Sequence, residues 1–186
     1  LRAGPEIGVA ATKTFSSQVT ALTLLAERLA QDRRGHRPDP RRTESERRAL
    51  VAALSRLPGH VQEVLDTSAA EAVAAAYGDS DAYFFIGRGL GHPVAMEGAL
   101  KVKEISYEHA EGFAASELKH GPLALVTERT PVFALFTGRD DAATLSNVKE
   151  VQARGAPVVA VAADPAGDVA EFDDFVLEVP ETHPDV

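Results

Sequence analysis

Residues 82–89 read Ala-Tyr-Phe-Phe-Ile-Gly-Arg-Gly, a continuous apolar run that ends in a glycine-rich turn. Such a run is typical of a strand buried on both faces, and the turn leads into a helix that we expect over residues 93–107. A polar helix is expected over residues 142–154, and further apolar runs predict strands at 131–136, 157–161 and 175–179. Strands that alternate with helices predict an α/β fold with a parallel sheet covered on both faces.

The chain before this sheet is helical by its pattern. Apolar side chains recur every three or four residues over 14–30, which predicts an amphipathic helix. Thr43 and Glu46 have the spacing of a capping box, so a second helix is expected to begin there. We expect Pro58 to interrupt that helix, and helical periodicity returns over residues 61–77.

Length and composition limit the functions that are open to this chain. It has 186 residues, a formal net charge of −9 and no cysteine. An acidic chain lacks the basic patch that nucleic acids and anionic membranes require, so we expect neither as a partner. Disulfides, thiolate metal sites and a cysteine nucleophile are excluded, and the histidines lack metal-ligand spacing, so no metal is expected. No apolar run could span a bilayer and no signal peptide is present, which predicts a cytoplasmic protein.

The domain division follows the change of pattern. We expect a helical lead-in over residues 1–80 and an α/β core over residues 81–186, with an exposed polar loop at 31–40. The chain opens on Leu1 without a methionine, and we expect it to be part of a longer protein.

Open parallel sheets bind ligands at the carboxyl ends of their strands. This rule points to the turn at 87–89 and to the segment 137–139. The first turn lacks the glycine spacing of a dinucleotide site and the Lys-Ser/Thr of a phosphate loop. It could present backbone N–H groups to an anion, or it could be a tight connection and nothing more.

Two further features could carry chemistry. Glu97, Lys101, Glu104 and Glu108 fall on one stripe of the helix that follows the turn. The stripe could be a solvated face with one ion pair, or it could hold a carboxylate base beside a lysine. His120 precedes a Gly-Pro pair, which places it at a helix end or in a loop, where it is either a surface histidine or a proton shuttle.

These features lie within longer motifs that resemble a known family. Residues 97–107 read Glu-Gly-Ala-Leu-Lys-Val-Lys-Glu-Ile-Ser-Tyr, residues 117–122 read Glu-Leu-Lys-His-Gly-Pro, and residues 3–15 read Ala-Gly-Pro-Glu-Ile-Gly-Val-Ala-Ala-Thr-Lys-Thr-Phe. All three resemble the second sugar-isomerase (SIS) domain of glucosamine-6-phosphate synthases, also called glutamine–fructose-6-phosphate aminotransferases (isomerising). The resemblance implies a three-layer α/β/α sandwich with a flavodoxin-like parallel sheet and a helical N-terminal segment.

The resemblance also implies a reaction, the conversion of fructose 6-phosphate and glutamine-derived ammonia to glucosamine 6-phosphate. Glu104 would be the base that moves a proton between C1 and C2 of the open sugar, with Lys101 beside the substrate. His120 would assist ring opening from the neighbouring subunit of a homodimer. No redox cofactor is required, because the amino group comes from ammonia.

Four residues would bind the substrate by the same resemblance. Glu97 matches a glutamate that lines the site, and Val9 lies by the sugar. Ala11 stands where the family usually has serine, which removes a hydroxyl contact. Arg88 occupies the turn equivalent to the phosphate-binding loop of the first SIS domain.

Other parts of the family's enzyme are not in these 186 residues. The glutaminase domain, the first SIS domain and a tail lysine that forms a Schiff base would belong to the rest of the parent chain, so we expect little activity from this piece alone. Two alternatives remain: a deglycase or aminosugar-phosphate isomerase without glutaminase, and a non-catalytic domain that senses phosphosugars.

Overall fold

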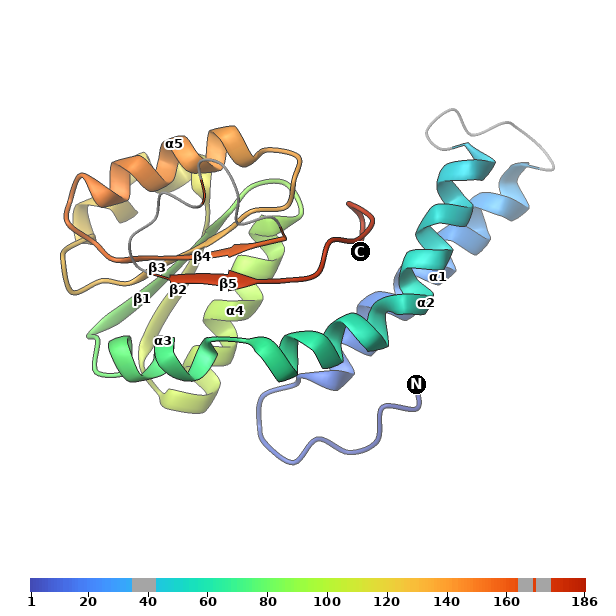
Figure 1. Ribbon diagram of the computed structural model, residues 1–186, viewed down its shortest axis with the longest axis horizontal. Coiled ribbons are helices and arrows are strands. Elements are labelled where there is room, and N and C mark those ends of the chain that lie inside the picture. Colours follow the sequence, from blue (N-terminus) through green and yellow to red (C-terminus); the bar gives the residue numbers. More distant parts are fainter. Residues whose placement is uncertain (35–42, 164–168, 170–174) are drawn as a thin grey trace. The chain divides into compact units, whose positions relative to one another are not determined.

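The computed structural model describes residues 1–34, 43–163, 169 and 175–186 of the chain. Its strands form one sheet (Figure 1), namely β1 (Ala82–Gly87), β2 (His109–Ala114), β3 (Val132–Leu135), β4 (Val158–Ala162) and β5 (Phe175–Glu178). All four pairings are parallel and the strand order is β2-β1-β3-β4-β5. This is the flavodoxin-like order, so the predicted parallel sheet is confirmed.

Helices cover both faces of the sheet (Figure 1). On one face, Tyr83 and Phe85 pack with Ala95 of α4 (Gly91–Ser106) and with Tyr77, the last residue of α3 (Ala70–Tyr77). On the other face, Phe84 and Ile86 pack with Val148 of α5 (Asp141–Gln152). Alternate side chains of β1 thus enter two separate apolar clusters, as a strand buried on both sides requires. The three-layer α/β/α architecture is confirmed.

The strand β2 was not predicted. Its sequence, His-Ala-Glu-Gly-Phe-Ala, lacks a long apolar run, and only Ala110 is fully buried within it. It occupies one edge of the sheet and pairs with β1 alone, for example through Phe85 and Gly112. Two short 3-10 helices follow it, Ala115–His120 and Pro122–Leu125.

The chain divides into two compact units, residues 1–59 with 185–186 and residues 60–184. The first unit contains α1 (Lys13–Arg34) and the larger part of α2 (Glu44–Thr67). Leu50 and Ala53 of α2 are fully buried. The amphipathic stripe predicted for α1 is present but open, because Leu22 and Leu29 are 64% and 55% exposed.

A buried charge lies between α1 and α2. Arg47 is 2% exposed, and its Nη2 lies 3.7 Å from the carboxylate of Glu27 on α1. Its Nη1 donates to the Glu27 carbonyl oxygen at 3.5 Å, and its Nε lies 3.8 Å from the carboxylate of Glu44. A charge inside protein is tolerated only when it is paired in this way.

Two expectations for the helices have different outcomes. The capping box is confirmed, because the Thr43 hydroxyl accepts from the Glu46 N–H while the Glu46 carboxylate accepts from Thr43 N–H. The interruption at Pro58 is wrong, because α2 runs through it to Thr67. A proline removes only one rung of the backbone ladder, and the helix ends instead before Ser68, whose hydroxyl accepts the first N–H of α3.

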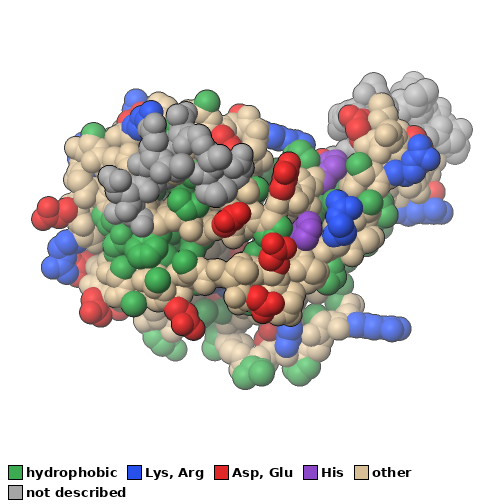
Figure 2. Space-filling model, viewed as in Figure 1, with side chains coloured by type: hydrophobic (Ala, Val, Ile, Leu, Met, Phe, Trp, Pro, Cys, Tyr) green, Lys and Arg blue, Asp and Glu red, His purple; other side chains and the backbone are tan. Residues whose placement is uncertain are grey.

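The predicted loop at 31–40 lies mostly outside the described residues, and its first four residues belong to α1. Among the described helices, none is long and apolar enough to cross a membrane. Figure 2 shows acidic side chains spread over the visible face of the sheet-containing unit, in keeping with the net charge of −9.

Candidate functional site

The helix α4 begins at the carboxyl end of β1 and lies directly against the sheet. A Cβ atom on Gly87 would lie 2.4 Å from the carbonyl carbon of Gly91, in the first turn of the helix. A Cβ on Gly112 of β2 would lie 2.5 Å from the Cα of Met96. Backbone-to-backbone contact of this kind needs residues without side chains, so these glycines set the position of α4.

The outer face of α4 brings three of the predicted residues together. The Nζ of Lys101 donates to Oε2 of Glu104 at 2.7 Å and lies 3.2 Å from Oε1 of Glu97. The three side chains are between 22% and 29% exposed, so the cluster is open to a ligand from one side. Residues three and four apart on a helix are neighbours, which is why the sequence spacing located this cluster.

The fourth member of the predicted stripe, Glu108, does not belong to it. The helix ends at Ser106, and Tyr107 has the left-handed conformation with φ of 64°. This turn takes the chain out of the helix before Glu108, whose N–H donates to the Ser106 hydroxyl. The prediction that Glu108 shares the stripe is wrong, because it assumes a helical position for a residue that lies beyond the end of α4.

The two carboxylates fix the protonation state of the lysine between them. The hydrogen bond to Glu104, followed by the interactions with Glu97, raises the pKa of Lys101 above 10.5, although partial desolvation opposes the shift. Lys101 is therefore a cation at neutral pH. A lysine that attacks a carbonyl must first be neutral, so this one is suited to hold a negative charge and not to form a Schiff base.

Arg88 is held by a residue that is not among those predicted from the sequence. Its Nε and Nη2 both donate to Oδ1 of Asn147, at 3.3 and 3.0 Å. Asn147 belongs to α5 and is only 6% exposed. The signal in the sequence was a polar residue among buried positions of a helix, because a buried amide needs a partner.

The two turns at the carboxyl ends of β1 and β3 are not free anion cradles. The N–H groups of Thr137 and Gly138 donate to Oδ1 of Asp141, at 3.0 and 2.9 Å. A Cβ on Gly89 would lie 3.2 Å from the carboxylate of Asp140. Carboxylates beside both turns disfavour a phosphate there.

His120 ends the 3-10 helix Ala115–His120, as its Gly-Pro neighbours predicted. Leu118 is fully buried, and Lys119 forms an ion pair of 2.8 Å with Glu150 of α5, so the segment is anchored while His120 itself is exposed. Within the described ranges, no hydrogen bond or ion pair joins His120 to the cluster of Lys101 and Glu104.

Val9 and Ala11 lie in the loop before α1, in the first unit. Val9 is 83% exposed and Ala11 is half-buried. The base of the loop is tied by Glu6, whose Oε1 accepts hydrogen bonds from the N–H groups of Thr12 and Thr14, both at 2.9 Å. Periodicity in the sequence gave no signal for this contact.

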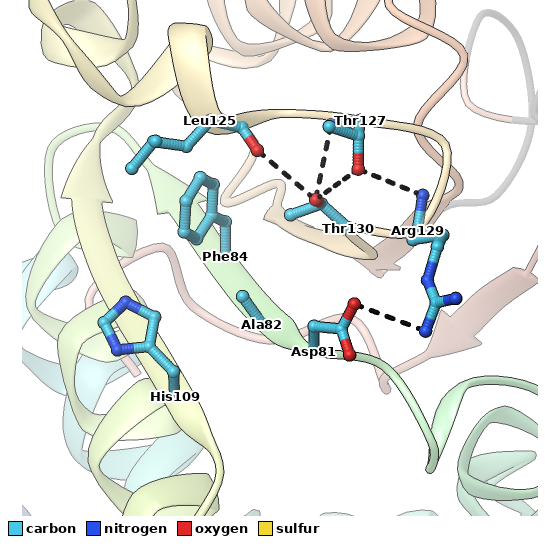
Figure 3. A pocket seen from close by; sticks show the side chains of 8 residues that line it. All are labelled: Asp81, Ala82, Phe84, His109, Leu125, Thr127, Arg129 and Thr130. Carbon is cyan, nitrogen blue, oxygen red and sulfur yellow. Dashed lines mark hydrogen bonds and ion pairs between the residues drawn. The ribbon is translucent and has the colours of Figure 1, made fainter.

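A pocket of about 280 Å³ lies at the opposite edge of the sheet, where β1, β2 and β3 begin (Figure 3). Several of its polar groups pair with one another: Thr130 Oγ1 accepts from Thr127 N–H at 3.3 Å, and Arg129 lies 3.2 Å from Asp81. The pocket is remote from the carboxyl ends of the strands, where such folds bind ligands. We assign no site to it.

The amino-acid sequence is similar to those of known enzymes. The chain is 49% identical over 97% of its length to the glutamine–fructose-6-phosphate aminotransferase (isomerising) of Methanosarcina acetivorans, and 51% identical over 99% to that of Halobacterium salinarum. It spans 29% and 30% of those two relatives, less than a third of their length.

A solved structure superposes on almost the whole chain. The C-terminal domain of glucosamine-fructose-6-phosphate aminotransferase from Francisella tularensis superposes with a TM-score of 0.83 and 34% identity, over 99% of this chain and 51% of that one. The model of the SIS domain family matches residues 78–185, which is more than half of the chain. The chain therefore belongs to the SIS domain family.

Proposed function

We propose that this chain is the isomerase region of a glutamine–fructose-6-phosphate aminotransferase, which makes glucosamine 6-phosphate from fructose 6-phosphate and ammonia. The observation that carries the proposal is the cluster of Glu97, Lys101 and Glu104 on α4, joined by contacts of 2.7 and 3.2 Å. Its residues stand at the positions of the family's motif, in a chain about half identical to enzymes of that name.

The geometry suits a proton shuttle between C1 and C2 of an open-chain sugar. Glu104 uses Oε2 to accept from Lys101, and its Oε1 has no hydrogen-bond partner among the described residues. That oxygen is available to take a proton from one carbon and return it to the next. The positive charge of Lys101 then stabilises the negative charge that develops on the sugar oxygens, with Glu97 holding the lysine in place.

By the same family motifs, further residues take part in the proposed reaction. Arg88 of the second unit, held by Asn147, and Val9 and Ala11 of the first unit each bind the substrate. His120 assists ring opening in the partner subunit of a homodimer, and its exposed position supports this role.

The enzyme works in the cytoplasm, with a glutaminase domain and a first SIS domain in the same parent chain. Residues 1–80 form the helical lead-in and 81–186 the SIS core.

The substitution Glu104→Gln in the full-length protein tests this assignment. The amide has nearly the same shape but cannot accept the proton, so we expect glucosamine 6-phosphate formation to fall by roughly 10²- to 10⁴-fold. Glutamine hydrolysis should persist, because it takes place in another domain. Both rates are measured on the same preparation, one by product formation and the other by glutamate release.

Glu108→Gln is the matched control. It makes the same chemical change four residues further on, outside α4, and should leave both rates unchanged. Isomerisation that survives Glu104→Gln would remove Glu104 from the role of base. A full-length protein that forms no glucosamine 6-phosphate even as wild type would favour the aminosugar isomerase or sensor alternatives.

A further inference from the structure

The carboxylate of Glu6 accepts several hydrogen bonds from residues at the start of α1. Its Oε1 accepts from Thr14 Oγ1 at 2.7 Å as well as from the N–H groups of Thr12 and Thr14 at 2.9 Å each. Its Oε2 accepts from Thr12 Oγ1 at 3.4 Å and lies 4.0 Å from Nζ of Lys13. Charge-assisted hydrogen bonds to the free N–H groups of a first helical turn are among the stronger local contacts.

These bonds close a loop over residues 7–11. Ala10 is 7% exposed, whereas Ile7 and Val9 are fully or largely exposed at 101% and 83%. A Cβ on Gly8 would have no atom within 4 Å, so the tip of the loop stands in open space. Its exposed residues Ile7 and Val9 therefore depend for their position on the buried Ala10 and on the base of the loop, which Glu6 ties to α1.

We propose that Glu6 is a positioning residue for substrate binding, which clamps the loop 7–11 so that Val9 and Ala11 meet the sugar in a fixed geometry. The inference rests on the proposed function, in which Val9 and Ala11 contact the sugar. A loop that is already ordered loses less conformational entropy when it binds, so a clamp increases affinity without touching the ligand.

The charge of Glu6 supports this role. Its hydrogen bonds with Thr14, and then those from Thr12 and the charge of Lys13, lower the pKa of Glu6 from 4.5 to about 2. The carboxylate is therefore ionised, and able to accept all of these bonds, throughout the range in which such enzymes work.

The test is Glu6→Ala in the full-length protein. We expect KM for fructose 6-phosphate to rise by roughly tenfold to a hundredfold, the effect of a misplaced binding element. The value of kcat should change much less, because the cluster on α4 is intact, and glutamine hydrolysis should not change. Steady-state kinetics over a range of fructose 6-phosphate concentrations separates the two constants.

Glu46→Ala is the matched control. Glu46 is also a carboxylate that accepts from a threonine N–H and hydroxyl at the start of a helix in the same unit, but it caps α2. Both variants lose a helix cap and should lose thermal stability to a similar extent, whereas only Glu6→Ala should raise KM. Thr14→Ser, which keeps the hydroxyl, should behave as wild type, and Thr14→Val should raise KM less than Glu6→Ala.

An unchanged KM in Glu6→Ala, or an equal rise in Glu46→Ala, would overturn the positioning role. Hydrogen exchange of the backbone amides of residues 7–14, read by mass spectrometry on the same proteins, tests the clamp itself. Exchange should be faster in Glu6→Ala than in wild type, and equal exchange would overturn the clamp. A wild-type protein without synthase activity would remove the proposed function, while the exchange experiment would still decide whether Glu6 holds the loop.

Discussion

Lys101 and Glu6 are held in their charged forms by the groups around them. Each charge stabilises the folded protein, but the contribution of Lys101 is lost at high pH and that of Glu6 at low pH. The pKa of Lys101 is raised chiefly by Glu104, so its stabilising contribution is complete below pH 10.5 and is lost as the pH rises through the raised value. The pKa of Glu6 is lowered to about 2 chiefly by the Thr14 hydroxyl, so its contribution is present above pH 4.5 and is lost as the pH falls through about 2. Both side chains are charged at neutral pH.

The loss of the Glu6 contribution at low pH can be tested with the substitution Glu6→Gln. Glutamine keeps the size of the side chain but not the charge, so we expect wild type to be the more stable protein at neutral pH. The difference should shrink as the pH falls from 4.5 towards 2, because Glu6 then takes up its proton. Urea midpoints of the two proteins over a series of pH values measure it, and a difference that does not depend on pH would contradict the lowered pKa.

At the scale of single residues, regular structure decides what sequence can reveal. The contacts of Lys101 with Glu97 and Glu104 follow from helical pitch, which is fixed, so their spacing located them. The hydrogen bond between Arg88 and Asn147 joins residues 59 positions apart and depends on how α5 packs on the sheet. A polar residue among apolar ones suggests that Asn147 needs a partner, but no pattern along the chain identifies that partner as Arg88.

At the scale of elements, Gly112 sets the distance between β2 and α4. A Cβ there would meet the Cα and N atoms of Met96 at 2.5 and 2.7 Å, and backbone atoms cannot rotate away. We expect Gly112→Ala to move α4 off the strand and to lower the free energy of unfolding by about 1–3 kcal/mol. Chemical denaturation of the variant and of wild type measures the change.

Gly59→Ala is the opposite case and serves as control. Gly59 lies inside α2 with no atom within 4 Å of the added methyl group. Alanine restricts the unfolded chain at this position and causes no clash in the folded protein. The free energy of unfolding of the variant should therefore rise by about 0.5–1 kcal/mol. Equal effects of the two substitutions would show that close approach does not explain Gly112.

Burial determines which strands can be predicted from the sequence. The inner strands β1, β3 and β4 have apolar runs because helices cover both faces of the sheet there. The edge strand β5 also has a short apolar run, although its residues are only partly buried. The edge strand β2 combines small and polar residues, and its place depends on its register with β1 and on Gly112. Likewise, the end of α4 depends on the left-handed Tyr107, a conformation that a tyrosine seldom adopts and that its sequence therefore does not announce.

At the scale of the whole molecule, the proposed site is distributed. Glu104 and His120 lie in the same unit without a direct contact, and His120 is exposed on an anchored segment. An exposed histidine can serve a neighbouring subunit only if the enzyme is a symmetric oligomer, in which each surface patch meets its counterpart.

Subunit mixing tests this arrangement. The full-length variants Glu104→Gln and His120→Asn should each be nearly inactive as homodimers. After the two are mixed and allowed to exchange subunits, mixed dimers contain one site with both wild-type residues, so we expect activity to return to about a quarter of wild type. If mixing restores nothing although exchange is shown with tagged subunits, His120 acts within its own chain.

The buried arginine between α1 and α2 has a consequence for how these helices assemble. Sliding one helix by a turn, about 5.4 Å, would take the guanidinium of Arg47 away from Glu27 and leave the buried arginine paired only with Glu44 of its own helix. Leucines alone would tolerate such a slip, because one apolar contact replaces another. We therefore expect the contact between Arg47 and Glu27 to favour the observed alignment of the two helices over a shifted one.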